Sequence, residues 1–242
     1  AAHVLTFDRQ RVDFVGAGEV WLVSSDKAFI QARYVSTPFT NGLAAMEAVV
    51  VGGPMLKGHT LRITSLQGRG VFWDATPILL AFPSNASLGE FGTISYDDRG
   101  KLAGATNNQL PRHIVHAFLP LGIDVQVMRW DHHINLRLRM PKQIKQDGQC
   151  GNFNDQKGDD TRDEIQARMD LTVAPGEMLF QTQLPPQGAK ELTLNDCEEQ
   201  RQRHAEYVCK EANPRFEGEM LKACMFDVCF EGRGYAAEDA LL

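Results

Sequence analysis

The sequence contains no apolar run of roughly 18 residues, the length that a membrane-spanning helix needs. It also lacks any cluster of lysine and arginine, and its formal net charge is −6. These absences predict that this segment neither inserts into a membrane nor binds nucleic acid. Low-complexity tracts are missing as well. With 43% hydrophobic and 23% charged residues, the 242-residue chain has the composition of a folded globular protein.

Common catalytic motifs are absent too, because the chain has no Gly-x-Ser-x-Gly, His-Glu-x-x-His or P-loop sequence. The histidines nonetheless raise the hypothesis of a metal or acid–base site, above all His113, His116, His132 and His133 beside Asp131. The first two lie three residues apart on an expected strand, a spacing that places them on opposite faces. The other two lie in an expected turn. We therefore expect no enzymatic activity.

Cysteine does not occur in the first 149 residues, and four of the five cysteines lie in the last fifth of the chain: Cys197, Cys209, Cys224 and Cys229. Their spacings of 12, 15 and 5 residues lack the Cys-x-x-Cys knuckles that zinc modules favour. Such a cluster is typical of a disulfide-stapled module in an oxidising compartment.

A charged leader and a small-residue cleavage site are absent from the first eight residues, which have the pattern of a strand. We expect that the numbering begins inside a longer precursor or after processing. Asn85-Ala-Ser87 is an N-glycosylation sequon in an expected loop. Together with the cysteines, it predicts a secreted or cell-surface protein.

Short runs of alternating apolar and polar residues fill the chain up to about residue 140, separated by Gly, Pro, Asn and Asp. In the last run, Ile134, Leu136 and Leu138 would face a core while the residues between them face water. This pattern predicts a mainly-β fold, an antiparallel β-sandwich. The expected strands cover residues 4–7, 20–23, 29–35, 45–51, 60–66, 92–96, 114–119, 123–128 and 134–140.

The end of the chain has a helical pattern instead. Asn195 or Asp196 can cap a helix over residues 197–211, and Asn213-Pro214 would stop it. A second helix is expected over residues 218–230, and a short helix or turn over 160–169.

These helices restrict the disulfide pairing. Cys197 and Cys209 would lie about 18 Å apart on one helix, far beyond the roughly 7 Å between the Cα atoms of a disulfide. Each therefore needs a partner on the second helix. Antiparallel packing predicts the bonds Cys209–Cys224 near the turn and Cys197–Cys229 further out.

One segment of eleven residues, from Cys150 to Asp160, has no apolar periodicity but is rich in amide and carboxylate oxygens. Ca²⁺ is the natural ligand of such a segment, because it takes about six to eight oxygen ligands, whereas Mg²⁺ prefers to keep its waters. Lys157 stands where an EF-hand loop needs glycine, so we discount that motif. The simpler alternative is a solvated acidic turn.

Five segments, in this order along the chain, carry a resemblance to a known domain family: residues 3–8 (HVLTFD), 14–23 (FVGAGEVWLV), 29–33 (FIQAR), 150–154 (CGNFN) and 224–229 (CMFDVC). From about residue 3 to 230 the chain resembles a von Willebrand factor type D (VWD) domain followed by a partial eight-cysteine module. The corresponding domains would be 1–174 for the VWD-like part, 175–194 for a linker, 195–232 for the helical module and 233–242 for a tail.

The resemblance implies a calcium ion held between the first strand and the Cys-Gly-Asn loop. Carried over by position, its ligands are the side chains of Asp8, Asn152, Asn154, Asp159 and Asp160, with the backbone carbonyl of Gln156. Three carboxylates would offset the charge of the ion, while the amides and the carbonyl raise its coordination number. We expect Gly151 and Gly158 to let the loop fold back.

The chain also departs from that family. Members usually carry a cysteine shortly before the position of His3 that bridges to the one before Gly-Asn, here Cys150. Without it, Cys150 is either unpaired or bonded to another chain. Asp147 replaces the first cysteine of the Cys-x-x-Cys that some members use for disulfide exchange, so we do not expect that chemistry here. Arg9 stands where the family usually has glycine.

The implied function is that of a non-enzymatic, calcium-binding structural or adhesive module of a larger secreted or surface glycoprotein. It would mediate assembly with other protein chains, either copies of itself or different ones. The alternative is the VWD portion of a large lipid-transfer or yolk-type protein.

Overall fold

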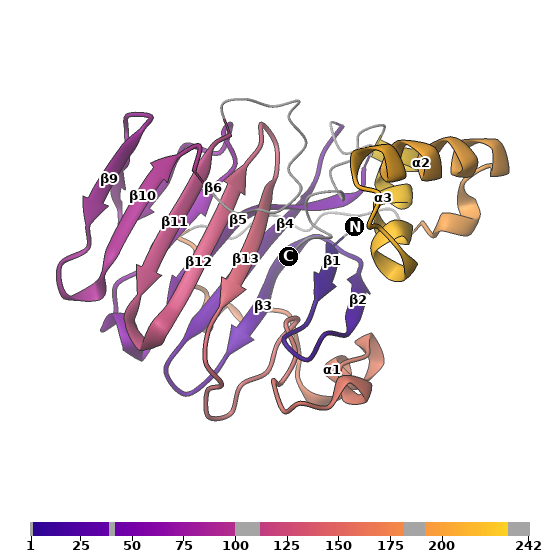
Figure 1. Ribbon diagram of the computed structural model, residues 1–242. Coiled ribbons are helices and arrows are strands. Elements are labelled where there is room, and N and C mark those ends of the chain that lie inside the picture. The colour runs from indigo at the N-terminus through magenta and orange to yellow at the C-terminus, as the bar shows by residue number, and fades with distance from the viewer. Residues whose placement is uncertain (1, 39–41, 100–111, 182–191, 232–242) are drawn as a thin grey trace.

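The computed structural model describes residues 2–38, 42–99, 112–181 and 192–231 (Figure 1). Over these ranges the chain is mainly antiparallel β-structure and ends in a pair of helices held by disulfides, which confirms the expected mainly-β fold. No helix in the described part is long and apolar enough to cross a membrane.

The larger sheet has the strand order β3-β4-β5-β6-β7-β8, with antiparallel neighbours throughout. Its strands follow one another in the chain, as expected where short connections join antiparallel neighbours. They are β3 (Gly18–Ser24), β4 (Phe29–Ser36), β5 (Ala44–Gly52), β6 (Leu61–Thr64), β7 (Val71–Trp73) and β8 (Thr76–Ile78).

The second sheet has the order β13-β12-β11-β10-β9 and lies in front of the first in Figure 1. It consists of β9 (Ser84–Ser87), β10 (Thr93–Asp97), β11 (Ile114–Leu119), β12 (Ile123–Arg129) and β13 (Ile134–Arg139). Side chains of both sheets, among them Ile30 and Val125, form one buried core between the two layers. The molecule is therefore a β-sandwich, as the alternating pattern predicts.

Strand β5 departs from that alternation because both of its faces are covered. Val49 and Val51 lie in the core between the sheets, whereas Val50 packs beneath Phe180 on the outer face. Gln31 holds this covering segment in place, since its side chain donates to the carbonyl of Glu177 and accepts from the amide of Leu179.

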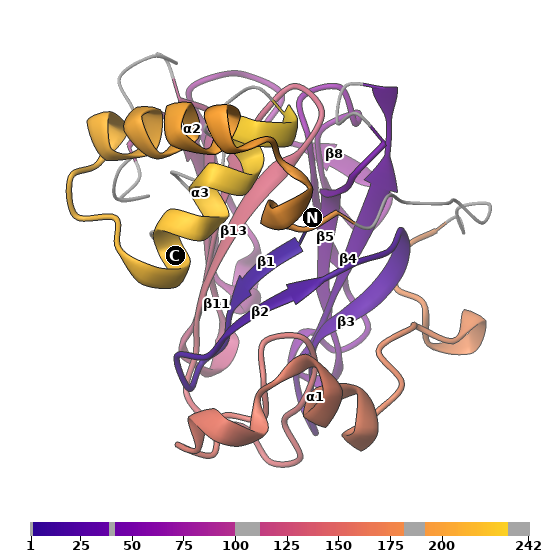
Figure 2. The same cartoon turned by 90° about the vertical axis from the view of Figure 1, so that its right-hand side faces the viewer.

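A separate hairpin precedes the sandwich strands. It pairs β1 (Ala2–Leu5) with β2 (Arg11–Phe14), a strand that the sequence patterns do not predict. Phe14 of β2 packs with Ile165 of α1 (Arg162–Arg168). Figure 2 shows the hairpin between α1 on one side and the two C-terminal helices on the other.

The C-terminal helices are α2 (Glu199–Ala212) and α3 (Gly218–Glu231). They are joined by Cys209–Cys224 and Cys197–Cys229, with Cα separations of 5.9 and 6.1 Å. This is the nested arrangement that the cysteine spacing predicts. The expected N-cap of α2 is wrong, because Glu198 rather than Asn195 or Asp196 occupies that position. Asp196 instead closes a capping box with Thr193 in the preceding 3-10 turn.

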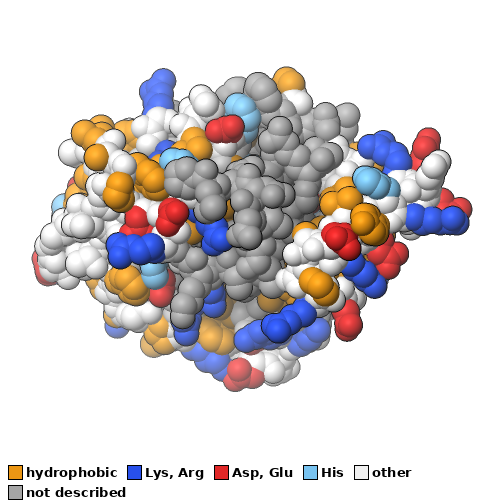
Figure 3. All heavy atoms as spheres, turned by 45° about the horizontal axis from the view of Figure 1, so that its top comes forward, with side chains coloured by type: hydrophobic (Ala, Val, Ile, Leu, Met, Phe, Trp, Pro, Cys, Tyr) orange, Lys and Arg blue, Asp and Glu red, His pale blue; other side chains and the backbone are white. Residues whose placement is uncertain are grey.

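The outer surface of α2 is solvated, with acidic and basic side chains interspersed where this helix lies at the right of Figure 3. Arg203 pairs with Glu199 and Lys210 with Glu206, each one helical turn apart. Such exposed pairs contribute little stability.

Candidate metal site

Backbone hydrogen bonds fix the start of the loop of residues 150–160 against the sandwich. The amide of Cys150 donates to the carbonyl of Leu22 at 3.1 Å, and its carbonyl accepts from the amide of Phe7 at 3.0 Å. The loop is thereby placed between the end of β1 and strand β3. At its far end, the hydroxyl of Thr161 caps α1 by accepting from the amide of Glu164.

Asp8 joins the hairpin to this loop, although 146 residues separate it from Asn154. Its Oδ2 accepts from the amide of Asn154 and its Oδ1 from the amide of Asp155, both at 2.9 Å. The turn that carries Asp8 is tight, since Arg9 has a left-handed φ of 68°. The first strand and the late loop therefore meet, as the resemblance implies.

Within the loop, two asparagine amides converge on one carboxylate. Asn152 and Asn154 each donate from Nδ2 to Oδ2 of Asp159, at 3.0 and 2.7 Å. These two hydrogen bonds lower the pKa of Asp159, and the bond from Asn152 has the larger effect. Since a carboxylate only accepts, they also fix the orientation of both amides. The Oδ1 of Asn154 accepts from the amide of Gln156, whose side chain is exposed.

Three oxygen atoms in this loop are buried without a hydrogen-bond partner among the described residues: Oδ1 of Asn152, Oδ1 of Asp159 and Oδ2 of Asp160. An unpartnered buried polar atom costs about 1–3 kcal/mol, so it calls for an explanation. Burial raises the pKa of Asp160, and the charge of Asp8 adds to this rise, against the hydrogen bond of Thr6 and the charge of Arg168. Asp160 is wholly buried.

These atoms fit a hard cation. All three belong to side chains that the resemblance nominates as calcium ligands, and carboxylate and amide oxygens are the donors that Ca²⁺ takes. No metal site formed by three or more His, Cys, Asp or Glu side chains occurs in the described part of the chain. The expected ligand set includes three carboxylates, those of Asp8, Asp159 and Asp160, and the structure does not bring these three together as a site of that kind.

The loop approaches itself so closely that glycine is needed at residue 151. Gly151 has a φ of 85°, and a Cβ there would lie 2.2 Å from Oδ2 of Asp160. Phe153 and Asp155 also adopt left-handed φ values, of 55° and 67°. Residues other than glycine rarely adopt this conformation, and those that do are often found at functional sites. The expectation for Gly158 is wrong, since its φ is ordinary and open space surrounds it.

Arg168, at the end of α1, is a residue of the site that sequence reasoning misses. Its guanidinium donates to both carboxylate oxygens of Asp147, at 2.8 and 3.0 Å. It also donates to the carbonyl of Asp159 and lies 3.5 Å from Oδ1 of Asp160. The hydrogen bond with Asp147 raises the pKa of Arg168. No motif predicts this contact, because it depends on the path of α1.

Cys150 forms no disulfide in the structure and packs against the core. Burial raises the pKa of its thiol to about 12, and the nearby charge of Asp160 contributes. The reactive thiolate is thereby disfavoured at neutral pH.

The remaining sequence candidates lie elsewhere. Asn85 is exposed on β9, an edge strand rather than the expected loop. His113 hydrogen-bonds the hydroxyl of Tyr96 at 2.8 Å, whereas His116 pairs with Asp124 at 2.6 Å. The structure thus gives these two histidines different partners. His132 and His133 lie in the connection between β12 and β13.

Comparisons with models of known protein families and with curated proteins find no match to this chain.

Proposed function

We propose that the loop of residues 150–160, together with Asp8, binds Ca²⁺, and that the protein is a calcium-stabilised structural module of an extracellular glycoprotein. The observation that carries this proposal is a set of three buried oxygens, on Asn152, Asp159 and Asp160, that have no hydrogen-bond partner in the described part of the chain. The resemblance of the sequence to a type D domain supports the same assignment.

The ion would be held by the carbonyl of Gln156 and by the side chains of Asp8, Asn152, Asn154, Asp159 and Asp160. Ca²⁺ would balance the negative charge of the three carboxylates. The role of the residues is structural. Asp8 belongs to the β1–β2 turn and the others to the loop before α1, so the site links segments distant in the chain. Binding to the native state alone would stabilise this junction.

The effect would extend to the C-terminal helices. His3 of β1 hydrogen-bonds Asp227 of α3 at 3.3 Å, so the hairpin that carries Asp8 also contacts the disulfide-bonded pair. A more rigid hairpin would hold the sandwich and the helices in one fixed arrangement. Such a fixed arrangement would favour assembly with other protein chains.

An extracellular location is compatible with the two disulfides, since such bonds persist in oxidising compartments. Glycosylation of Asn85 is part of the proposal. Its exposed side chain on an edge strand is sterically suited to a glycan.

The decisive experiment is thermal unfolding of the protein with Ca²⁺ and with EDTA, repeated for Asp160→Asn. At a hundredfold excess over the dissociation constant, the ion should stabilise the native protein by about 2.7 kcal/mol. The substitution should abolish the shift. Asp163→Asn is the matched control, because Asp163 is an exposed carboxylate three residues further on. A calcium shift that Asp160→Asn preserves would refute the site.

Assembly is tested separately, by light scattering of the protein with Ca²⁺ and with EDTA. A mass above that of one chain in calcium, lost in EDTA, would support assembly of identical copies. If the mass is that of one chain in both buffers, identical copies do not assemble. The proposal would then be limited to partner chains of a different sequence.

A further inference from the structure

Arg168, at the end of α1, brings a positive charge to the residues of the candidate calcium site. Its guanidinium donates to both carboxylate oxygens of Asp147, at 2.8 and 3.0 Å. It also donates to the backbone carbonyl of Asp159 and lies 3.5 Å from Oδ1 of Asp160. Two residues of the expected calcium site therefore already contact a cation that belongs to the chain itself.

The surrounding carboxylates favour a positive charge at this position. The hydrogen bond with Asp147 is the largest cause that raises the pKa of Arg168, and the charges of Asp147, Asp159 and Asp160 add to it. Asp160 is wholly buried, and its Oδ2 is one of the three buried oxygens without a hydrogen-bond partner among the described residues. The guanidinium thus engages Asp160 through Oδ1 alone and leaves its second oxygen unmatched.

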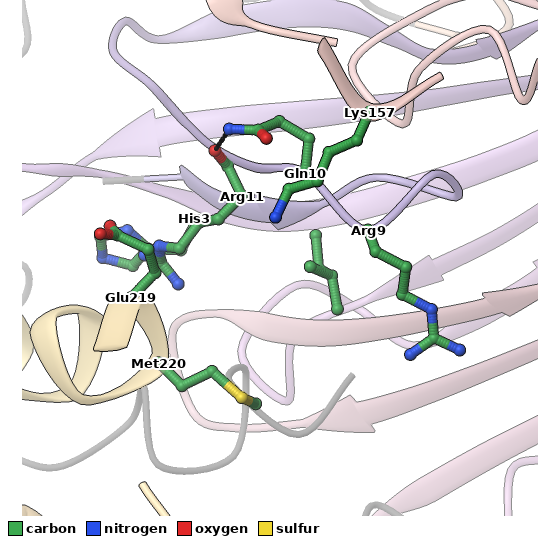
Figure 4. A pocket seen from close by; sticks show the side chains of 8 residues that line it. His3, Arg9, Gln10, Arg11, Lys157, Glu219 and Met220 are labelled. Carbon is green, nitrogen blue, oxygen red and sulfur yellow. Dashed lines mark hydrogen bonds between the residues drawn. The ribbon is translucent and has the colours of Figure 1, made fainter. Parts of the chain in front are cut away.

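The two cations closest in the chain to the expected ligands do not take this place. Arg9 and Lys157 line a pocket of about 290 Å³ beside the β1–β2 hairpin, and their charged ends extend in different directions (Figure 4). In the described part of the chain, the only ion pair to a carboxylate of the expected calcium site comes from Arg168.

Two further cations at this pocket have partners of their own. Arg11 donates to Asp13 at 3.0 Å. His3 lies between two carboxylates, 2.7 Å from Asp13 and 3.3 Å from Asp227. Burial, the largest cause, lowers the pKa of His3, but the hydrogen bonds and charges of both carboxylates outweigh it and raise the pKa to about 9. Arg168 is therefore the cation of this region that bears on the calcium ligands.

The shape of the loop does not depend on Arg168 alone. The carboxylate of Asp159 accepts from two asparagine amides of the same loop. Asp8 accepts from the amides of Asn154 and Asp155, which ties the loop to the hairpin. Loss of the guanidinium should therefore leave the oxygens of the site near their present places.

We propose that Arg168 is an internal counter-charge of this site, which competes with Ca²⁺ and weakens its binding. The inference rests on the proposed calcium site and concerns the regulation of its affinity. Like charges repel, and at a partly buried position this repulsion is screened less than in bulk water. A metal ion bound by Asp159 and Asp160 meets this repulsion. The same guanidinium stabilises the cation-free loop, because it neutralises carboxylates that otherwise repel one another.

The test is the dissociation constant for Ca²⁺, measured by isothermal titration of the full chain in about 0.15 M salt. Arg168→Gln and Arg168→Met both remove the charge, so the result does not depend on the folding of one variant. We expect each to bind Ca²⁺ about tenfold more tightly than the native chain. Urea unfolding in EDTA should show that both variants fold, with lower stability than the native chain.

Two variants serve as controls. Arg168→Lys keeps the charge but loses the planar fork that donates to both oxygens of Asp147, so its dissociation constant should stay within about threefold of the native value. Lys157→Gln removes one positive charge from the same loop, at a side chain that lines the pocket instead. It should change the dissociation constant by less than about twofold, because an exposed charge is screened by salt.

The outcomes separate this inference from the proposed function. Tighter binding by the neutral variants, with native-like binding by Arg168→Lys, upholds the inference. Calcium binding by the neutral variants but not by the native chain also upholds it, and at the same time refutes the proposed function. Equal or weaker binding by the neutral variants, or equally tight binding by Arg168→Lys, overturns the inference and leaves the calcium site standing. No binding by any of these proteins overturns both.

Discussion

The carboxylate of Asp160 lies directly against the backbone of Gly151, where a Cβ would come within 2.2 Å of its Oδ2. The wholly buried carboxylate can take this position only because residue 151 has no side chain. The contact therefore fixes how the loop folds back on itself between residues 151 and 160.

Gly151→Ala should therefore destabilise the protein by about 2 kcal/mol or more, because it combines a steric clash with a φ of 85° that alanine disfavours. Urea unfolding measures the effect. Gly158→Ala in the same loop is the control, since its Cβ would meet nothing within 4 Å. It should change the free energy of unfolding by less than about 0.5 kcal/mol. Equal costs at the two positions would contradict this account.

The pair of carboxylates around His3 predicts a loss of stability in alkaline solution. The pKa of His3 is raised from an ordinary value of 6.5 to about 9, so its contribution is complete below pH 6.5 and disappears as the pH rises through 9. The contribution of protonated His3 to the free energy of unfolding is about 3 kcal/mol. Urea unfolding between pH 6 and 10 should show this fall for the native sequence but not for His3→Gln. Parallel curves for the two proteins would rule out the role of His3.

His133 should act in the opposite direction. Burial, the largest cause, lowers its pKa from 6.5 to about 4. A histidine that is kept neutral in the folded state costs stability as the pH falls below 6.5, because the unfolded chain takes up the proton first. His133→Gln should flatten the acid limb of the stability curve between pH 6.5 and 4. An unchanged acid limb would show that other groups cause the loss.

Arg168 should stabilise the junction of α1 and the loop even without calcium. Arg168→Gln leaves Asp147 and the carbonyl of Asp159 without this donor, and the side chain is only 26% exposed. We expect a loss of about 1–2 kcal/mol in urea unfolding with EDTA present. Arg162→Gln, at the exposed start of α1, should cost less than about 0.5 kcal/mol. A similar cost for both would assign no special role to Arg168.

Reduction of the disulfides should loosen the helical pair before the sandwich. The bonds Cys209–Cys224 and Cys197–Cys229 cross-link chain separations of 15 and 32 residues, and such links contribute about 2–4 kcal/mol each. Under reducing conditions, hydrogen exchange should accelerate in α2 and α3 but not in β5 or β12, whose core has no disulfide among the described residues. Equal acceleration everywhere would mean that the two parts unfold together.

Much of the fold can be read from local patterns. Alternation over residues 123–128 and 134–140 predicts β12 and β13, but the expectation that the polar positions face water is wrong at Gln126 and Asn135, which are buried. The spacing of the four C-terminal cysteines predicts their pairing from two antiparallel helices, although Cys197 lies just before α2 rather than on it. Local patterns fail at β2, which is four residues long, and at β9, whose sequence Ser-Asn-Ala-Ser is polar. Both strands form because neighbouring strands supply hydrogen-bond partners.

The sequence by itself determined which residues carry the oxygens of the candidate site, since amides and carboxylates concentrate in one segment without apolar periodicity. Only the tertiary structure decided that Asp8 meets this loop across 146 residues and that Arg168 contacts it from α1. Among the described residues, it alone left three oxygens of this loop buried without partners. The physical reason is that burial and pairing of polar groups depend on how distant segments pack, which no local pattern records.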